Sequence, residues 1–230
     1  MKKPYIRKYD KVSKFVVWIV NGKYIRKNLD EEFTSFGHHL RFKFIPENEF
    51  WIDREKGGNE SKFYIDHLLV ENRLMSKGMS YSEASEKAYK VQERERSRSR
   101  LIKKELKRKE YKEELINKVH KKLLRKYSKK INVWLVSGKL VRGTFFVEFT
   151  EGGHDKVYKF IPKNEIWIDN DLSLDEIPFV LLHELHERNL MSKGKGYDKA
   201  HRLSSKVEYF CRHHPEQTEK KIKQELKKLK

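Results

Sequence analysis

The sequence contains one nine-residue segment twice, as IPENEFWID at Ile45–Asp53 and as IPKNEIWID at Ile161–Asp169. A second segment, LMSKG, occurs at Leu74–Gly78 and again at Leu190–Gly194. Both pairs are 116 residues apart, since 161 − 45 and 190 − 74 give the same difference. The same spacing relates other residues further out: Trp18 and Trp134, Gly22 and Gly138, Tyr81 and Tyr197. A constant spacing over so long a stretch indicates that one unit was duplicated whole.

Each copy begins with a pattern typical of β-strands. Phe15–Val20 is rich in β-branched and aromatic residues, and Asn21-Gly22 after it is typical of a tight hairpin turn. The second copy has the strand pattern Val133–Val136, then Ser137-Gly138 and a returning strand at Lys139–Val141. Further short strands are expected at Arg41–Ile45 and Lys156–Ile161, each followed by Pro and a strand that ends in Trp-Ile-Asp.

The later part of each copy predicts two helices. In the second copy, Ser173 and Glu176 have the spacing of a capping box, which predicts a helix that runs to about Met191. A further helix is expected at Tyr197–Arg212, and the first copy has the corresponding pair near Lys62–Ser76 and Tyr81–Gln92. We therefore expect an α+β fold in which each copy is a small antiparallel sheet followed by a helical hairpin.

Most of the excess positive charge lies between the copies, in residues 94–130. Apolar residues recur there at near-helical spacing without Gly or Pro, which predicts a long amphipathic helix that joins the copies. The expected organisation is a first lobe at 1–93, a basic helical connector at 94–130, a second lobe at 131–214 and a basic C-terminal helix at 215–230.

Composition excludes several classes of protein. The chain has 230 residues, with 53 Lys and Arg against 34 Asp and Glu, which gives a net charge of +19. Its single cysteine, Cys211, excludes an intrachain disulfide and a cysteine-rich zinc module. The longest apolar run, Phe15–Val20, is far shorter than the ~20 residues that a membrane span needs, so no membrane partner is expected. The basic N-terminus lacks a secretory apolar region behind it, which predicts a cytoplasmic protein.

Side chains able to hold a metal ion gather in the second copy. His183 and Glu187 lie one helical turn apart, and folding the hairpin about Gly194 brings His201 level with Glu187. Glu208 lies two turns further along the same stripe, within a turn of His183. Two imidazoles and two carboxylates suit zinc, or manganese or iron in a carboxylate site. These four residues are therefore the predicted metal ligands, with Glu208 either a fourth ligand or a group that supports one.

The segment His183-Glu184-Leu185-His186-Glu187 resembles the HExxH motif of the zincin metallopeptidases. In that family the two histidines bind zinc, and the glutamate between them acts as general base toward a zinc-bound water. The resemblance covers this helix and implies a metal-dependent hydrolase in which Glu184 activates water. It departs from the motif at Glu187, which stands where the second histidine is expected, while His186 lies one position early.

The first copy provides a comparison within the same chain. The first copy keeps the histidine and the carboxylate of the pair His183 and Glu187, as His67 and Glu71. The other three positions differ: Glu184 becomes Leu68, His201 becomes Ser85 and Glu208 becomes Gln92. Hydrogen-bonded His–Glu pairs that stabilise the hairpin are therefore an alternative to a metal site. His154 and Asp169 of the second copy correspond to His38 and Asp53 of the first. These residues either orient a metal ligand or mark the end of a strand.

The connector supports a second hypothesis, a non-enzymatic protein that binds nucleic acid through electrostatic contacts. No sequence motif for reading bases accompanies the charge, so only non-specific contact with nucleic acid or with an acidic protein is expected. A third alternative is a scaffold that binds a partner protein through its paired lobes. The candidate nucleic-acid contacts are Arg94, Arg96, Arg98, Arg100, Lys103, Lys104, Lys107 and Arg108.

Overall fold

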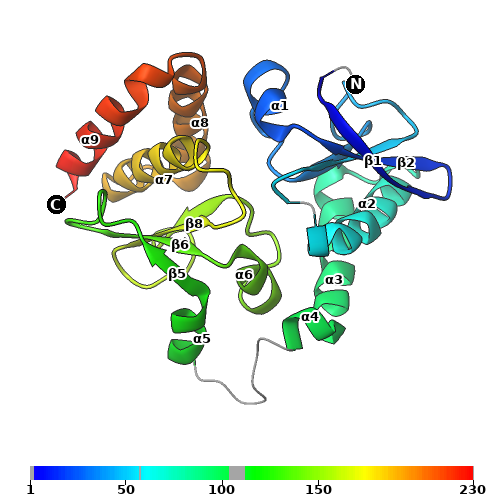
Figure 1. The fold of residues 1–230 in the computed structure, drawn as a ribbon, viewed down its shortest axis with the longest axis horizontal. Coiled ribbons are helices and arrows are strands. Elements are labelled where there is room, and N and C mark those ends of the chain that lie inside the picture. Colours follow the sequence, from blue (N-terminus) through cyan, green and yellow to red (C-terminus); the bar gives the residue numbers. More distant parts are fainter. Residues whose placement is uncertain (1–2, 57, 104–111, 230) are drawn as a thin grey trace. The chain divides into compact units, whose positions relative to one another are not determined.

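The computed structural model of the chain describes residues 3–56, 58–103 and 112–229. The chain forms two compact units (Figure 1). The first unit comprises Met1–Glu110 with Arg142–Glu148, and the second comprises Tyr111–Val141 with Phe149–Lys230. Each unit contains one four-stranded sheet and one helical hairpin, so the predicted α+β fold with two similar lobes is confirmed.

The two sheets have the same topology. In the first unit the order is β1-β2-β4-β3, and in the second it is β5-β6-β8-β7. The two central strands of each sheet run parallel and the outer pairs are antiparallel, so the sheets are mixed where the sequence suggested antiparallel ones. The strands of the first sheet are β1 (Tyr5–Val12), β2 (Phe15–Val20), β3 (Phe36–His38) and β4 (Glu49–Asp53). Those of the second are β5 (His120–Leu123), β6 (Asn132–Val136), β7 (Gly152–His154) and β8 (Glu165–Asp169).

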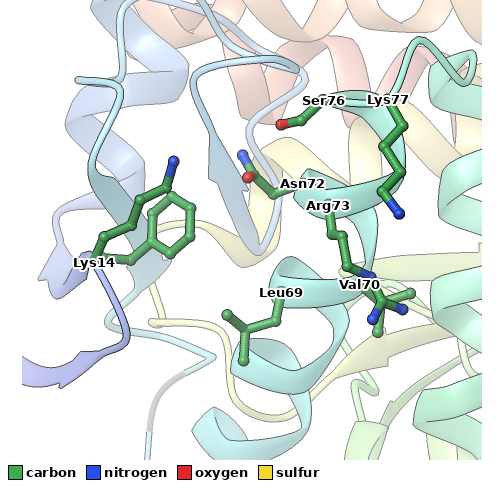
Figure 2. Close-up of a pocket in the computed structure, with 8 residues that line it drawn as sticks. Lys14, Leu69, Val70, Asn72, Arg73, Ser76 and Lys77 are labelled. Carbon is green, nitrogen blue, oxygen red and sulfur yellow. The ribbon is translucent and has the colours of Figure 1, made fainter.

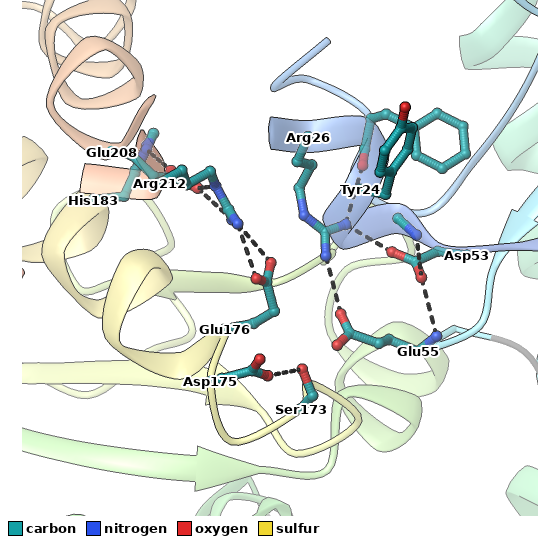
Figure 3. Close-up of polar contacts among 12 residues, drawn as sticks. Tyr24, Arg26, Asp53, Glu55, Ser173, Asp175, Glu176, His183, Glu208 and Arg212 are labelled. Atoms are coloured by element: carbon teal, nitrogen blue, oxygen red, sulfur yellow. Dashed lines mark hydrogen bonds and ion pairs between the residues drawn. The ribbon is translucent and has the colours of Figure 1, made fainter. Parts of the chain in front are cut away.

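The predicted hairpin after the first central strand is wrong, because a short helix follows this strand in both copies: α1 (Gly22–Asn28) and α6 (Gly138–Thr144). The Asn21 side chain caps α1 by accepting a hydrogen bond from the Tyr24 backbone N–H at 3.1 Å. Gly22 is required for close packing, since a Cβ at this position would lie 1.7 Å from a carboxylate oxygen of Asp53. That carboxylate is itself paired with the buried Arg26 at 2.7 Å (Figure 3).

The strands expected at Arg41–Ile45 and Lys156–Ile161 are absent, because tight turns occupy these segments. In the first of them, the backbone N–H of Phe42 donates to the His38 carbonyl at 2.9 Å. The strands ending in Trp-Ile-Asp are confirmed as β4 and β8.

The helical hairpins are confirmed as α2 (Ser61–Met75) with α3 (Tyr81–Arg98), and α7 (Ile177–Ser192) with α8 (Tyr197–His213). Gly78 and Gly194 lie between the paired helices with φ of +88° and +84°, a conformation that favours glycine. The capping box predicted at Ser173 is wrong, because the hydroxyl of Ser173 bonds Asp175 and α7 begins at Ile177.

The connector is not the single long helix that its apolar spacing predicts. α3 ends at Arg98, a short helix α4 (Arg100–Lys103) follows, and α5 (Lys112–Val119) leads directly into strand β5. The remainder of the predicted helix, residues 104–111, lies outside the described residues. The strand at His120 is stabilised by sheet pairing and by stacking of the His120 ring on Trp134, with ring centroids 4.2 Å apart. Tertiary contacts therefore override the local helical pattern.

The C-terminal helix is confirmed as α9 (Thr218–Lys228), and it packs on α7. Its buried Ile222 joins a core cluster with Leu182 and Leu185 of α7 and Ile166 of β8. This packing holds α7 between the sheet and α9, so the side chains of α7 are well positioned. Among the described residues, no helix is both long and apolar enough to cross a membrane.

Candidate metal centre

The hairpin α7–α8 brings three potential ligand atoms together. His183 Nε2 lies 3.1 Å from His201 Nδ1 and 3.5 Å from Glu187 Oε2. His201 Nδ1 lies 2.9 Å from Glu187 Oε2 and closes the triangle. A tetrahedral zinc ion with bonds of about 2.0–2.1 Å separates its ligand atoms by roughly 3.3 Å, so the triangle has suitable dimensions. Three of the four predicted ligands therefore converge as the sequence suggested.

The fourth predicted ligand, Glu208, contacts the other nitrogen of the His183 ring. Its Oε2 lies 2.9 Å from His183 Nδ1, and its Oε1 accepts hydrogen bonds from Arg212 at 2.9 and 2.7 Å. Arg212 also donates to both carboxylate oxygens of Glu176, at 2.8 and 3.0 Å (Figure 3). Both oxygens of Glu208 are thus already bonded, which makes it a support for His183 rather than a direct ligand.

This support determines which nitrogen of His183 is available. Burial would raise the pKa of Glu208, but the charge of Arg212 and the hydrogen bond with His183 outweigh it and lower the pKa to about 2. The carboxylate is therefore ionised and only accepts hydrogen bonds, so His183 Nδ1 must carry a proton. In the neutral ring the lone pair then lies on Nε2, which faces Glu187 and His201. Metal-binding histidines are commonly oriented in this way by a carboxylate.

Glu187 has a comparable support on its other oxygen. His154 Nε2 lies 3.1 Å from Glu187 Oε1. The backbone N–H of Lys156 donates to His154 Nδ1 at 3.2 Å, so the proton of the neutral His154 ring is on Nε2 and is donated to Glu187. His154 therefore orients the Glu187 carboxylate and leaves Oε2 for an ion, although its ring nitrogen is also near Glu184. Asp169 lies apart from this arrangement and accepts from the Asp171 N–H at the end of β8.

Charge distribution within the cluster follows from these contacts. Burial would lower the pKa of His183, but its hydrogen bonds to Glu187 and Glu208 raise that pKa well above its usual value. Burial would raise the pKa of Glu187, but hydrogen bonds from His154, His183 and His201 hold it well below the ordinary range. In the metal-free protein these two carboxylates therefore favour the protonated form of His183.

Glu184, the predicted general base, is buried beside the triangle. Burial is the main cause that raises its pKa to about 7. A Cβ on Gly152 would lie 3.1 Å from its Oε1, so the glycine leaves room for the carboxylate. The corresponding positions in the first unit, 116 residues earlier, hold Leu68 and Phe36. In the second unit, Glu184 therefore supplies a carboxylate where the first has a leucine, and Gly152 leaves space for it where the first has a phenylalanine.

The first unit keeps the same pair in a closed, hydrogen-bonded form. His67 Nε2 lies 3.1 Å from Glu71 Oε2, and His38 Nε2 lies 3.0 Å from Glu71 Oε1. The Gln92 amide has one orientation that completes the hydrogen bonds of both His67 and Arg96. In it, the amide nitrogen donates to His67 Nδ1 at 3.2 Å and the amide oxygen accepts from Arg96 at 3.0 Å. The proton of His67 is then on Nε2 and is donated to Glu71, so no lone pair is left for an ion.

The surroundings of the two histidines also differ. The His67 ring contacts Phe36 and Tyr89, with ring centroids 5.0 and 4.4 Å away. The positions equivalent to Phe36 and Tyr89 hold Gly152 and Ser205 in the second unit. Sequence reasoning missed these differences, and it also missed the chain of contacts from Glu208 through Arg212 to Glu176. A residue-by-residue alignment of the two copies at the 116-residue spacing shows the substitutions, whereas the contacts of Arg212 are visible only in the structure.

The Glu71 cluster leads to a prediction about acid stability. Burial would raise the pKa of Glu71, but hydrogen bonds from His38 and His67 lower it to about 2, below the value of 4.5 in the unfolded chain. A lowered pKa stabilises the fold above pH 4.5, and this contribution is lost as the pH falls toward 2. For a buried group, this shift of the pKa contributes on the order of 3 kcal/mol to the free energy of unfolding. Urea titrations between pH 6 and pH 3 should show a shallower pH dependence for Glu71→Gln than for the wild type.

Glu86→Gln is the control for this measurement, because Glu86 is exposed and forms its salt bridge with the exposed Lys90. It should leave the pH dependence unchanged. Equal slopes for Glu71→Gln and the wild type would contradict the prediction.

The candidate nucleic-acid contacts are only partly accessible. Arg96 is wrongly predicted as a phosphate contact, because it is 1% exposed, pairs with Glu60 and lies over the Phe63 ring. Arg94, Arg98, Arg100 and Lys103 are exposed, whereas Lys104, Lys107 and Arg108 lie outside the described residues. Binding of nucleic acid or an acidic protein by this segment stays a prediction.

Comparison with known proteins provides no assignment for this arrangement. No protein-family model matches the chain, and neither a curated protein nor a solved structure does.

Proposed function

We propose that the second unit binds one divalent ion, preferably zinc, and that the protein is a metal-dependent hydrolase. The ligands in this proposal are His183 Nε2, Glu187 Oε2 and His201 Nδ1. The observation that supports it most is the contact of Glu208 with His183 Nδ1 at 2.9 Å, because this contact directs the lone pair of the ring toward the other two ligands. Two imidazoles and one carboxylate form a ligand set found in catalytic zinc sites, which keep a fourth position open.

Each neighbouring side chain has a role in this proposal. A bound zinc ion would lower the pKa of a water molecule to about 7. Glu184, whose pKa is raised to about 7 by burial, is suited to accept a proton near neutral pH. The His201 side chain is 37% exposed, so the cluster is reachable from solvent along α8. The resemblance of the helix to the zincin motif agrees with this division of roles, and a cytoplasmic site of action is part of the proposal.

The first test is the metal content of the 230-residue chain. After removal of bound metal and incubation with excess zinc, elemental analysis should find about one zinc ion per chain. Zinc should also raise the thermal unfolding temperature, because a ligand that binds only the folded state stabilises it. A chain that takes up no zinc and unfolds at the same temperature would show that the cluster is a purely hydrogen-bonded one.

Glu208→Gln tests the argument from the proton position. A glutamine donates its amide N–H to His183 Nδ1, as Gln92 does to His67, which moves the ring proton to Nε2 and blocks the ligand. We expect zinc affinity to fall about 10–100-fold, the usual effect of losing a group that orients a ligand. Isothermal titration calorimetry measures the change. Gln92→Glu in the first unit is the matched control and should leave affinity unchanged, because Ser85 offers no imidazole there.

A further inference from the structure

The second unit covers one face of α7 with its own helix α9. The Glu225 carboxylate of α9 lies 3.0 Å from His186 Nδ1 and accepts from Asn189 Nδ2 at 2.8 Å. Lys130 Nζ donates to the Leu229 carbonyl at the end of the helix, at 2.6 Å. The apolar side chains of α9 join the core cluster that contains Ile131 and Leu185. Glu225, the C-terminal end of the helix and an apolar stripe thus hold α9 against α7, and Glu219 adds hydrogen bonds from Lys126 and Tyr127.

The equivalent face of the first unit is a surface hollow of about 480 Å³ (Figure 2). Its lining consists of Lys14, Phe15, Leu69, Val70, Asn72, Arg73, Ser76 and Lys77. At the 116-residue spacing, the positions that hold α9 in the second unit fall in this lining: Lys130, Ile131, Leu185, His186 and Asn189 correspond to Lys14, Phe15, Leu69, Val70 and Arg73. The hollow is therefore the counterpart of the α9 seat.

The described part of the first copy does not place a helix in this seat. Ile102 stands at the position of Thr218, the first residue of α9. Its side chain is buried and packs beside Gly143, where a Cβ would lie 2.8 Å from Ile102 Cδ1. At the point where the second copy turns back over α7, the first copy therefore runs toward Gly143.

The hollow has features that favour an acidic occupant. Lys14, Arg73 and Lys77 are exposed cations, and none of them has an ion pair among the described residues. The Asn72 side chain is buried, and its Nδ2 has no hydrogen-bond acceptor among the described residues. A buried donor without an acceptor costs stability, which a carboxylate or carbonyl of a bound partner would relieve.

We propose that this hollow is the docking site for an acidic amphipathic helix of a partner protein. The helix would place apolar residues on Phe15, Leu69 and Val70, with the spacing of Ile222, Leu226 and Leu229 in α9. An acidic residue at the position of Glu225 would pair with Arg73, and the C-terminal end of the helix would face Lys14. This is helix-in-groove recognition, with the packing of α9 on α7 as its template within the same chain. The proposal uses different residues from the metal centre and does not depend on it.

Binding of a synthetic peptide to the 230-residue chain tests the proposal. The peptide is the α9 segment Thr218–Leu229 with its five lysines replaced by glutamate, so that the apolar residues and Glu225 remain. Fluorescence anisotropy of the labelled peptide should give a Kd on the order of 10 µM in the presence of 0.15 M salt. Arg73→Glu and Val70→Glu should each weaken binding at least tenfold. Lys87→Glu, which makes the same change of charge as Arg73→Glu on the exposed face of α3, should change it by less than twofold.

Three results would overturn the proposal. Equal weakening by Arg73→Glu and Lys87→Glu would mean that the peptide responds only to the net charge of the protein. Retained binding by the Val70→Glu variant would place the peptide elsewhere. Tighter binding of the unaltered, basic α9 peptide would identify the occupant as α9 of a second copy of this chain rather than an acidic partner.

Discussion

Replacing His201 with serine is expected to lower the zinc affinity of the second unit by about a thousandfold or more. Zinc sites contribute about 10–16 kcal/mol of binding free energy, so losing one of three protein ligands removes several kcal/mol. A thousandfold change corresponds to about 4 kcal/mol. The fold should persist, because the first unit carries serine at the equivalent position, Ser85, and its hairpin is formed. Competition with a chromophoric zinc chelator measures the affinity.

Ser85→Ala in the first unit is the matched control. Since the His67 and Glu71 pair is closed by hydrogen bonds, this change should leave zinc affinity and stoichiometry as in the wild type. An unchanged affinity in His201→Ser would contradict the ligand assignment. If zinc binding were lost in both variants, the assignment of the ion to the second unit alone would be wrong.

Replacing Arg212 with methionine is expected to lower the free energy of unfolding by about 3–5 kcal/mol. Arg212 is 3% exposed and bonds the carboxylates of Glu176 and Glu208, which are also buried. Its loss removes the cation that bonds both of these buried carboxylates, so the cost of their desolvation is less fully compensated. Urea unfolding of the metal-free protein, followed by circular dichroism, measures the change.

Two comparisons show whether the buried charges cause the loss. Arg202→Met removes an exposed arginine from the same helix and should change stability by no more than about 0.5 kcal/mol. Adding Glu176→Gln and Glu208→Gln to Arg212→Met should recover much of the stability, because the buried carboxylate charges are then removed. A variant Arg212→Met as stable as the wild type would contradict the predicted role of this contact.

Local patterns predicted the helical hairpins and the convergence of His183, Glu187 and His201. Helix periodicity and the equal distances of Glu187 and His201 from the turn at Gly194 suffice for this, because two paired helices keep side chains at fixed heights. The same reasoning failed at Gly22 and at His120. Asn21-Gly22 is typical of a hairpin turn, but Gly22 makes room for the Asp53 carboxylate. The connector pattern predicts a helix at His120, but this segment forms a strand because it pairs with β6.

The sequence by itself determined that the chain is a duplicated α+β unit and that the second copy gathers imidazoles and carboxylates on one hairpin. Only the tertiary structure decided what these groups can do, because proton positions depend on contacts between distant residues. Glu208 accepts from His183 in one unit, whereas Gln92 donates to His67 in the other. No local pattern contains that difference, since it arises when Arg212 holds the Glu208 carboxylate ionised next to Nδ1 of the His183 ring.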